Sequence, residues 1–108
     1  MFDNWRCAAL KINVGAAVGS YIDSCPLWDD RVERTVTRSH SVVVAGSSAV
    51  RVTCRVVLHA GTNLHRGEYN AEWTRGLLGE IAEILNSRGF LVIKEESDGG
   101  PALEVRRS

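Results

Sequence analysis

The 108-residue sequence has no apolar run long enough to cross a bilayer, and its first residues lack the basic and apolar segments of a secretory signal. We therefore expect a protein of the cytosol, or one assembled from it. The chain has only two prolines, no internal repeat and no low-complexity segment. With 44% hydrophobic and 24% charged residues, it does not have the composition of a disordered protein. This length predicts one domain, residues 1–108, with one core.

Cysteine is scarce, and the three cysteines, Cys7, Cys25 and Cys54, form no CxxC motif. An odd number of cysteines, in a chain whose size does not require disulfides, predicts reduced thiols. His59 follows Cys54 by five positions, so on one extended strand their side chains would project from opposite faces. A structural zinc site needs about four convergent ligands. The sequence therefore predicts no metal site, with Cys54 buried and with His59 and His65 at the surface beside a loop.

The chain also lacks a nucleotide-binding motif, because "GAAVG" and "AGSSA" match neither GxGxxG nor GxxxxGK[ST]. Cys54 and His40 would share a face of a hairpin, but a cysteine within a row of valines is typical of a buried, unreactive thiol. We therefore expect no catalytic residue and no cofactor. A thiol enzyme that uses Cys54 or Cys25 is an alternative, and it requires rapid alkylation of one cysteine near neutral pH.

Residues 3–23 show helical spacing and predict a first helix with Asp3 as its N-cap. Its apolar positions recur every three to four residues: Trp5, Ala9, Ile12, Ala16 and Gly19. Two interior glycines, Gly15 and Gly19, each cost about 1 kcal/mol relative to alanine. The helix is therefore expected to end near Val14.

The next segment is rich in β-branched residues and predicts a hairpin, with strands over 32–45 and 50–60 joined by "GSSA". In the second strand the even positions are apolar, whereas Arg51 and Arg55 fall on the odd face. A register that pairs even with even positions buries the valines of both strands. Val42 and Val44 are then expected beside Val50 and Val52 on the core side.

Residues 69–88 carry the clearest helical pattern of the chain, followed by Gly89 as a left-handed cap. The predicted apolar stripe consists of Tyr69, Trp73, Leu77, Ile81, Ile84 and Leu85. A strand "FLVIKEE", a turn "SDGG" with positive φ at Asp98 and Gly99, and a strand "ALEVRR" complete the order α-β-β-α-β-β. The predicted fold class is α+β: a small single domain whose antiparallel or mixed sheet packs against a long amphipathic helix.

Charge is unevenly distributed in this formally neutral chain: residues 31–66 carry a net +5, against −2 before and −3 after this segment. Eleven of the thirteen basic residues are arginines, the cation favoured in protein interfaces. The candidate interface residues are Arg31, Arg34, Arg38, Arg51 and Arg55 on the hairpin and Glu72, Glu80 and Glu83 on the second helix. The arginines could instead track phosphates, but the acidic start "GEYNAEW" of that helix favours protein over nucleic acid.

The order of the predicted helices and strands is similar to that of a known protein family. A helix, the junction "VGSYIDSCP", a hairpin with the strand "RVTCRVVLHAG", a long helix and then "GFLVI" resemble the tail-terminator and tail-completion proteins of tailed bacteriophages over most of the chain. The resemblance implies a non-enzymatic virion protein that assembles in the host cytoplasm as a homomeric ring, commonly a hexamer. That ring would cap the tail tube and join it to the neck and head connector proteins. A glycine-broken first helix and an arginine-rich first strand depart from the family, so ring size and binding face stay open.

These features suggest that the ring forms through contacts of arginines with carboxylates and through sheet edges. A second hypothesis is a small binding or inhibitor protein that engages a basic partner site through the acidic helix face formed by Glu72, Glu80 and Glu83. Neither hypothesis involves a membrane.

Overall fold

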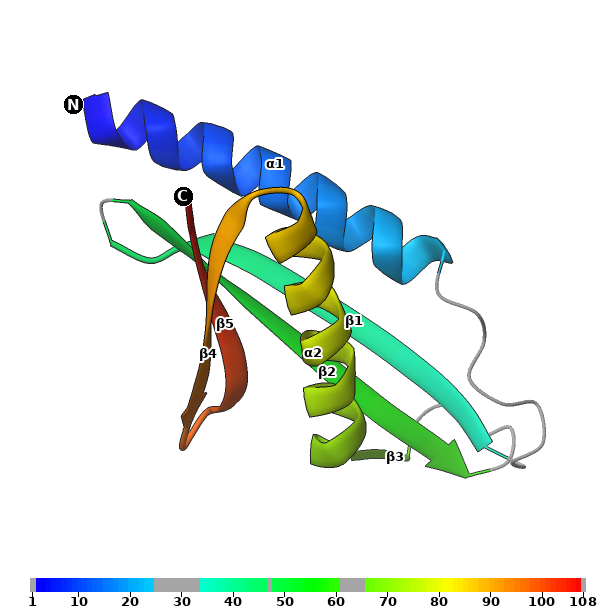
Figure 1. Ribbon diagram of the computed structural model, residues 1–108. Helices are drawn as coiled ribbons and strands as arrows, with labels where there is room; N and C mark the ends of the chain where they lie inside the picture. Colours follow the sequence, from blue (N-terminus) through cyan, green and yellow to red (C-terminus); the bar gives the residue numbers. More distant parts are fainter. Residues whose placement is uncertain (1, 25–33, 47, 61–65, 108) are drawn as a thin grey trace.

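The computed structural model describes residues 2–24, 34–46, 48–60 and 66–107. In chain order its elements are α1 (Phe2–Ser24), β1 (Arg34–Val44), β2 (Ala49–Ala60), β3 (Gly67–Tyr69), α2 (Ala71–Ser87), β4 (Phe90–Ser97) and β5 (Gly100–Arg107). One antiparallel sheet has the order β1-β2-β5-β4, and β3 also pairs with β2. Both helices cover the same face of this sheet (Figure 1). The predicted α+β fold is confirmed, and the short strand β3 is an element that the sequence did not reveal.

Strand β2 supplies the centre of the core, because its even-numbered side chains point toward both helices. Val50, Val52 and Val56 are fully buried and pack with residues of α1, α2 and β5. The hairpin register pairs Val42 with Val52 and Val44 with Val50, so the even-to-even register is confirmed. Val42 packs against the core, but Val44, the last residue of β1, is 48% exposed, so its expected burial is wrong. A one-residue slip would expose this whole row of valines, which explains why burial selects the observed register.

Helix α1 differs from its prediction in length and in orientation. It continues without a break through Gly15 and Gly19 to Ser24, and Ile12, assigned to the buried stripe, is 70% exposed. The buried side is instead formed by Cys7, Leu10, Val14, Ala17 and Val18. This face packs on β1, β2 and α2, and burial of these side chains offsets the cost of the two glycines.

Helix α2 begins two residues later than expected, since Asn70 is its N-cap and accepts a hydrogen bond from the backbone N–H of Trp73 at 2.8 Å. Tyr69 therefore belongs to β3 and not to the helical stripe. The predicted burial of Leu77, Ile81 and Leu85 is confirmed.

The positive-φ turn positions were predicted in part. Gly89, which follows the C-cap residue Arg88 of α2, has a left-handed φ of 90°, as expected. In the β4–β5 turn the left-handed residue is Gly100, with a φ of 103°, and not Gly99.

The start of α2 is joined to the middle of β2 by a set of hydrogen bonds. The backbone N–H of Val56 donates to the Thr74 hydroxyl at 3.1 Å, and that hydroxyl donates to the Asn70 carbonyl at 2.7 Å. The Asn70 N–H in turn donates to the Val56 carbonyl at 2.9 Å. Thr74 is fully buried, so its hydroxyl replaces the strand neighbour that Val56 would otherwise need.

We expect Thr74→Val to lower the free energy of unfolding by about 1–3 kcal/mol, because the near-isosteric side chain leaves the buried Val56 N–H without an acceptor. The matched control, Thr74→Ser, keeps the hydroxyl and loses one buried methyl group, at a cost of about 1 kcal/mol. Urea denaturation of both variants measures the difference. An unchanged midpoint for Thr74→Val would contradict this role of the hydroxyl.

Candidate interaction surface

No element in the described part of the chain covers the face of the sheet opposite the helices, and we call this the open face. It is formed by the odd-numbered residues of β1 and β2 and by their partners in β5 and β4. One row across it joins Val43, Arg51, Glu104 and Ile93, each paired in register with the next. Val43 and Ile93, at the two ends of this row, are 46% and 43% exposed. The open face therefore has charged residues at its centre and aliphatic residues on its outer strands.

The charges at the centre of the open face are paired. Arg51 Nε lies 3.2 Å from Glu95 Oε2, and the Arg106 guanidinium lies 3.0 Å from Glu104 Oε1. The guanidinium of Arg55 lies over the ring of Tyr69, 5.1 Å from its centroid, in a cation–π contact. Exposed ion pairs of this kind contribute only about 0–1 kcal/mol each, so a partner can exchange them at little cost.

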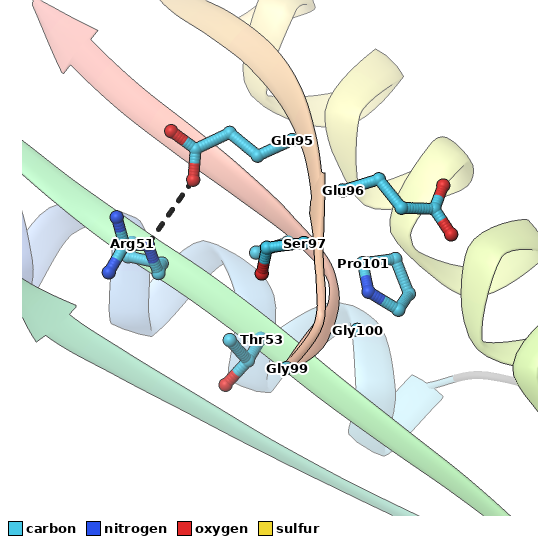
Figure 2. Close-up of a pocket in the computed structure, with 9 residues that line it drawn as sticks. Arg51, Thr53, Glu95, Glu96, Ser97, Gly99, Gly100 and Pro101 are labelled. Carbon is cyan, nitrogen blue, oxygen red and sulfur yellow. Dashed lines mark hydrogen bonds and ion pairs between the residues drawn. The ribbon is translucent and has the colours of Figure 1, made fainter.

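A groove crosses the open face where the strands separate. Strand β5 pairs with β2 only over residues 103–106, so the β4–β5 turn diverges from β2 beyond that point. Arg51 and Thr53 line one side of the groove, and Glu95, Ser97 and Gly100 line the other. Figure 2 shows Arg51 and Glu95 reaching toward each other, while Glu96 points away toward the helices.

Glu96 belongs to the opposite side of the hairpin, where it accepts hydrogen bonds from the Arg75 guanidinium of α2. The hydrogen bond lowers the pKa of the Glu96 carboxyl and raises the pKa of Arg75. This exposed pair ties the end of β4 to the start of α2. Both glutamates line the groove, and Glu95 is the one that pairs across it with Arg51.

The structure separates the arginines that the sequence grouped together. Arg51 and Arg55 are exposed on the open face, as their odd positions predicted. Arg38 is half-buried and lies opposite Val56, on the side of the sheet that the helices cover. Arg34 is the first residue of β1, and Arg31 lies outside the described residues. The hairpin arginines therefore do not form one continuous basic face.

The acidic residues of α2 lie on the helix layer, on the other side of the molecule from the open face. Glu72 and Glu83 are exposed. Glu80 accepts a hydrogen bond from the hydroxyl of Tyr21, which ties α1 to α2. Glu80 thus has a structural partner within the chain, and the acidic surface offered to other molecules is narrower than the three residues suggested.

His59 is buried, with 6% of its surface exposed, so its predicted surface position is wrong. Its ring lies against Gly67 of β3, where a Cβ atom would collide with the His59 ring and with Val57. Its Nε2 lies 3.0 Å from the Thr37 hydroxyl. The unrecognised strand β3 covers this position, which explains the error. His65, the second predicted surface histidine, lies outside the described residues.

Cys54 faces the core opposite His40 in the hairpin register, as expected, and is 8% exposed. Burial raises the pKa of the Cys54 thiol to about 12. Cys7 is also buried, and Cys25 lies outside the described residues. Within the described part of the chain, His, Cys, Asp and Glu side chains form no cluster of three that could hold a metal ion.

The exposed aliphatic residues of the open face were not among the candidate residues from the sequence. Leu91 and Ile93 are 50% and 43% exposed on β4. The run "FLVI" contained the signal, because four consecutive apolar residues on a strand place two of them on each face. Phe90 and Val92 contact the core, so Leu91 and Ile93 face away from it.

Comparison with known proteins finds no matching family model, no similar curated protein and no similar solved structure. No helix in the described part of the chain is both long and apolar enough to span a membrane. The function of the open face therefore has to be inferred from its own residues.

Because Cys54 is buried, we expect its thiol to react slowly with alkylating reagents. A pKa of about 12, against 9.0 for an ordinary thiol, leaves roughly 1,000-fold less thiolate near neutral pH. We expect iodoacetamide at pH 7.5 to label Cys54 at the ordinary rate only after denaturation, as measured by peptide mass spectrometry over time. Rapid labelling of Cys54 in the folded protein would contradict this prediction and would support the thiol-enzyme hypothesis.

Proposed function

We propose that the protein is a non-enzymatic structural subunit of a phage virion, a tail-terminator or neck/tail-completion protein that forms a homomeric ring between the tail tube and the head connector. The observation that supports this most directly is the open face. A sheet covered by helices on one side presents on its other side exposed aliphatic side chains, exchangeable ion pairs and a groove. Such a surface suits contact with other proteins.

The two layers of the fold suit a subunit with two different contacts. A ring subunit must bind its neighbours and also a second kind of protein, the tube or the connector. We assign contact with the tube or connector to the centre of the open face, where Arg51 and Arg55 present guanidinium groups to solvent. Arginine on a rigid strand forms geometrically defined pairs with carboxylates of a partner.

Self-assembly is the first test of this proposal. Mass photometry and negative-stain electron microscopy of the purified chain, alone and with tail tubes of the phage that encodes it, would reveal rings. We expect ring-shaped particles of one size, formed either in solution or on tube ends. A protein that stays monomeric at high concentration and low salt, and that leaves tube ends bare, would contradict the proposal.

The role of the arginines is tested by the double substitution Arg51→Glu and Arg55→Glu. Both side chains are exposed, so the fold should be retained. Reversal at Arg51 removes the pair with Glu95 and places like charge opposite Glu104, so we expect a loss of stability of only about 1 kcal/mol. Co-sedimentation with tail tubes should fall at least tenfold, because the partner's carboxylates then meet like charge.

The matched control reverses the same number of charges on the helix side, at Arg6 and Lys11 of α1, which are both exposed. We expect this control to bind tubes as the unmodified protein does. Equal loss of binding in both double variants would mean that net charge, and not the open face, governs the interaction.

A further inference from the structure

Among the described strands, both outer strands of the sheet have an edge without a partner strand. In the sheet order β1-β2-β5-β4, no described strand pairs with the outer side of β1 or of β4. β1 has eleven residues without the lysines or prolines that commonly protect an exposed edge from pairing. Of the six exposed large hydrophobic residues in the described part of the chain, four lie on these two strands: Val43, Val44, Leu91 and Ile93.

Strand direction determines how two copies could join. Every neighbouring pair along β1-β2-β5-β4 is antiparallel, so β1 and β4 run in opposite directions. When a second copy is placed beside the first in the same orientation, its β1 runs antiparallel to the β4 that it meets. The sheet then continues across the boundary with all helices on one side, and repetition of this contact generates a ring if the rotation closes.

The residue pattern of the two strands matches this antiparallel join. β1 carries Arg34 and Arg38 in its first half and ends with three valines, whereas β4 begins with Phe90–Ile93 and carries Glu95 and Glu96 in its second half. With Val43 opposite Leu91 of the neighbouring copy, Val42 meets that copy's Val92. In the same register Arg38 lies opposite that copy's Glu96, which already pairs with Arg75 of its own chain, so the intersubunit contact would extend an existing ion pair. Apolar ends and opposite charges are therefore aligned in one register.

Pairing of identical edges does not achieve this match. Two β1 strands aligned antiparallel over their full length would place Val44 of one copy beside Arg34 of the other. Two β4 strands would place Leu91 beside Glu96 and Val92 beside Glu95. In both cases an apolar half meets a charged half, which favours the join between unlike edges.

We propose that β1 of one copy pairs antiparallel with β4 of the next copy, so that the assembly is held by one continuous sheet. This inference rests on the proposed function insofar as it requires self-assembly, and it names the surface that each copy offers to the other. The occupant of each free edge is a second copy of this chain. The centre of the open face stays available to a different protein.

Disulfide trapping tests the join. In a Cys25→Ser background we would make two double variants, Val43→Cys with Leu91→Cys and Val43→Cys with Ile93→Cys, which cover two neighbouring registers. Within one chain the two positions are separated by three strand spacings, about 14 Å, and a disulfide needs Cα atoms within about 7 Å. A disulfide between them can therefore form only between copies. All three positions are exposed, so the core is left intact.

We expect mild oxidation of at least one double variant to convert most chains into a ladder of covalent species larger than dimers on a non-reducing gel. Mass spectrometry should identify the β1–β4 linkage. The matched control, Ile12→Cys with Leu91→Cys, combines β4 with an exposed position on α1 and should give no ladder. Each single-cysteine variant can form at most a dimer.

The outcomes separate this inference from the proposed function. Intact rings without a ladder in either double variant would overturn the edge join while leaving the ring proposal in place. Efficient dimers of a single-cysteine variant would show pairing of identical edges and would also overturn the join. A chain that stays monomeric even with tail tubes would overturn both.

Discussion

The hydrogen bonding of strand β2 is the constraint on which the rest of the structure depends. One edge of β2 is fully paired with β1. The other edge is shared by three partners: β5 at residues 49–52, the N-terminus of α2 at Val56, and β3 at residues 57–59. Between β5 and β3, Thr74 and Asn70 provide hydrogen-bond partners for the backbone of Val56. This single strand therefore positions both helices and the β4–β5 hairpin.

β2 has partners on both edges, whereas β1 and β4 are the outer strands of the sheet, with no described strand beyond them. The same strands carry most of the exposed large aliphatic residues, whereas the paired charges lie between them. Backbone hydrogen-bonding capacity and apolar surface thus coincide at the two outer strands. That coincidence is the physical basis for assigning the edges to assembly and the centre of the open face to another protein.

Strong local periodicity allowed much of the fold to be predicted. The alternation in β2 determined the hairpin register, and the stripe of α2 identified Leu77, Ile81 and Leu85 as core. The prediction of the buried face of α1 was wrong, because small and apolar residues occur all around that helix. Only tertiary packing selects its buried side.

Predictions of the surface failed for a different reason. Three-residue β3 is too short to show periodicity, and it buries His59 and removes Tyr69 from the helix. The arginines were grouped by their nearness in sequence, but strand parity places Arg38 on one side of the sheet and Arg51 and Arg55 on the other. Predicting the exposure of Leu91 and Ile93 requires knowing which face of β4 the helices cover, and the sequence of β4 alone does not reveal this.

Amide hydrogen exchange tests most directly the central claim that the free edges of the subunit are filled by neighbouring copies. Exchange would be followed by mass spectrometry on peptides covering β1, β2 and β4, in dilute monomer and in assembled rings. The account predicts that alternate amides of β1 and β4 exchange rapidly in the monomer and become protected in the ring, while β2 is protected in both states. Identical exchange of β1 and β4 in monomer and ring would contradict it.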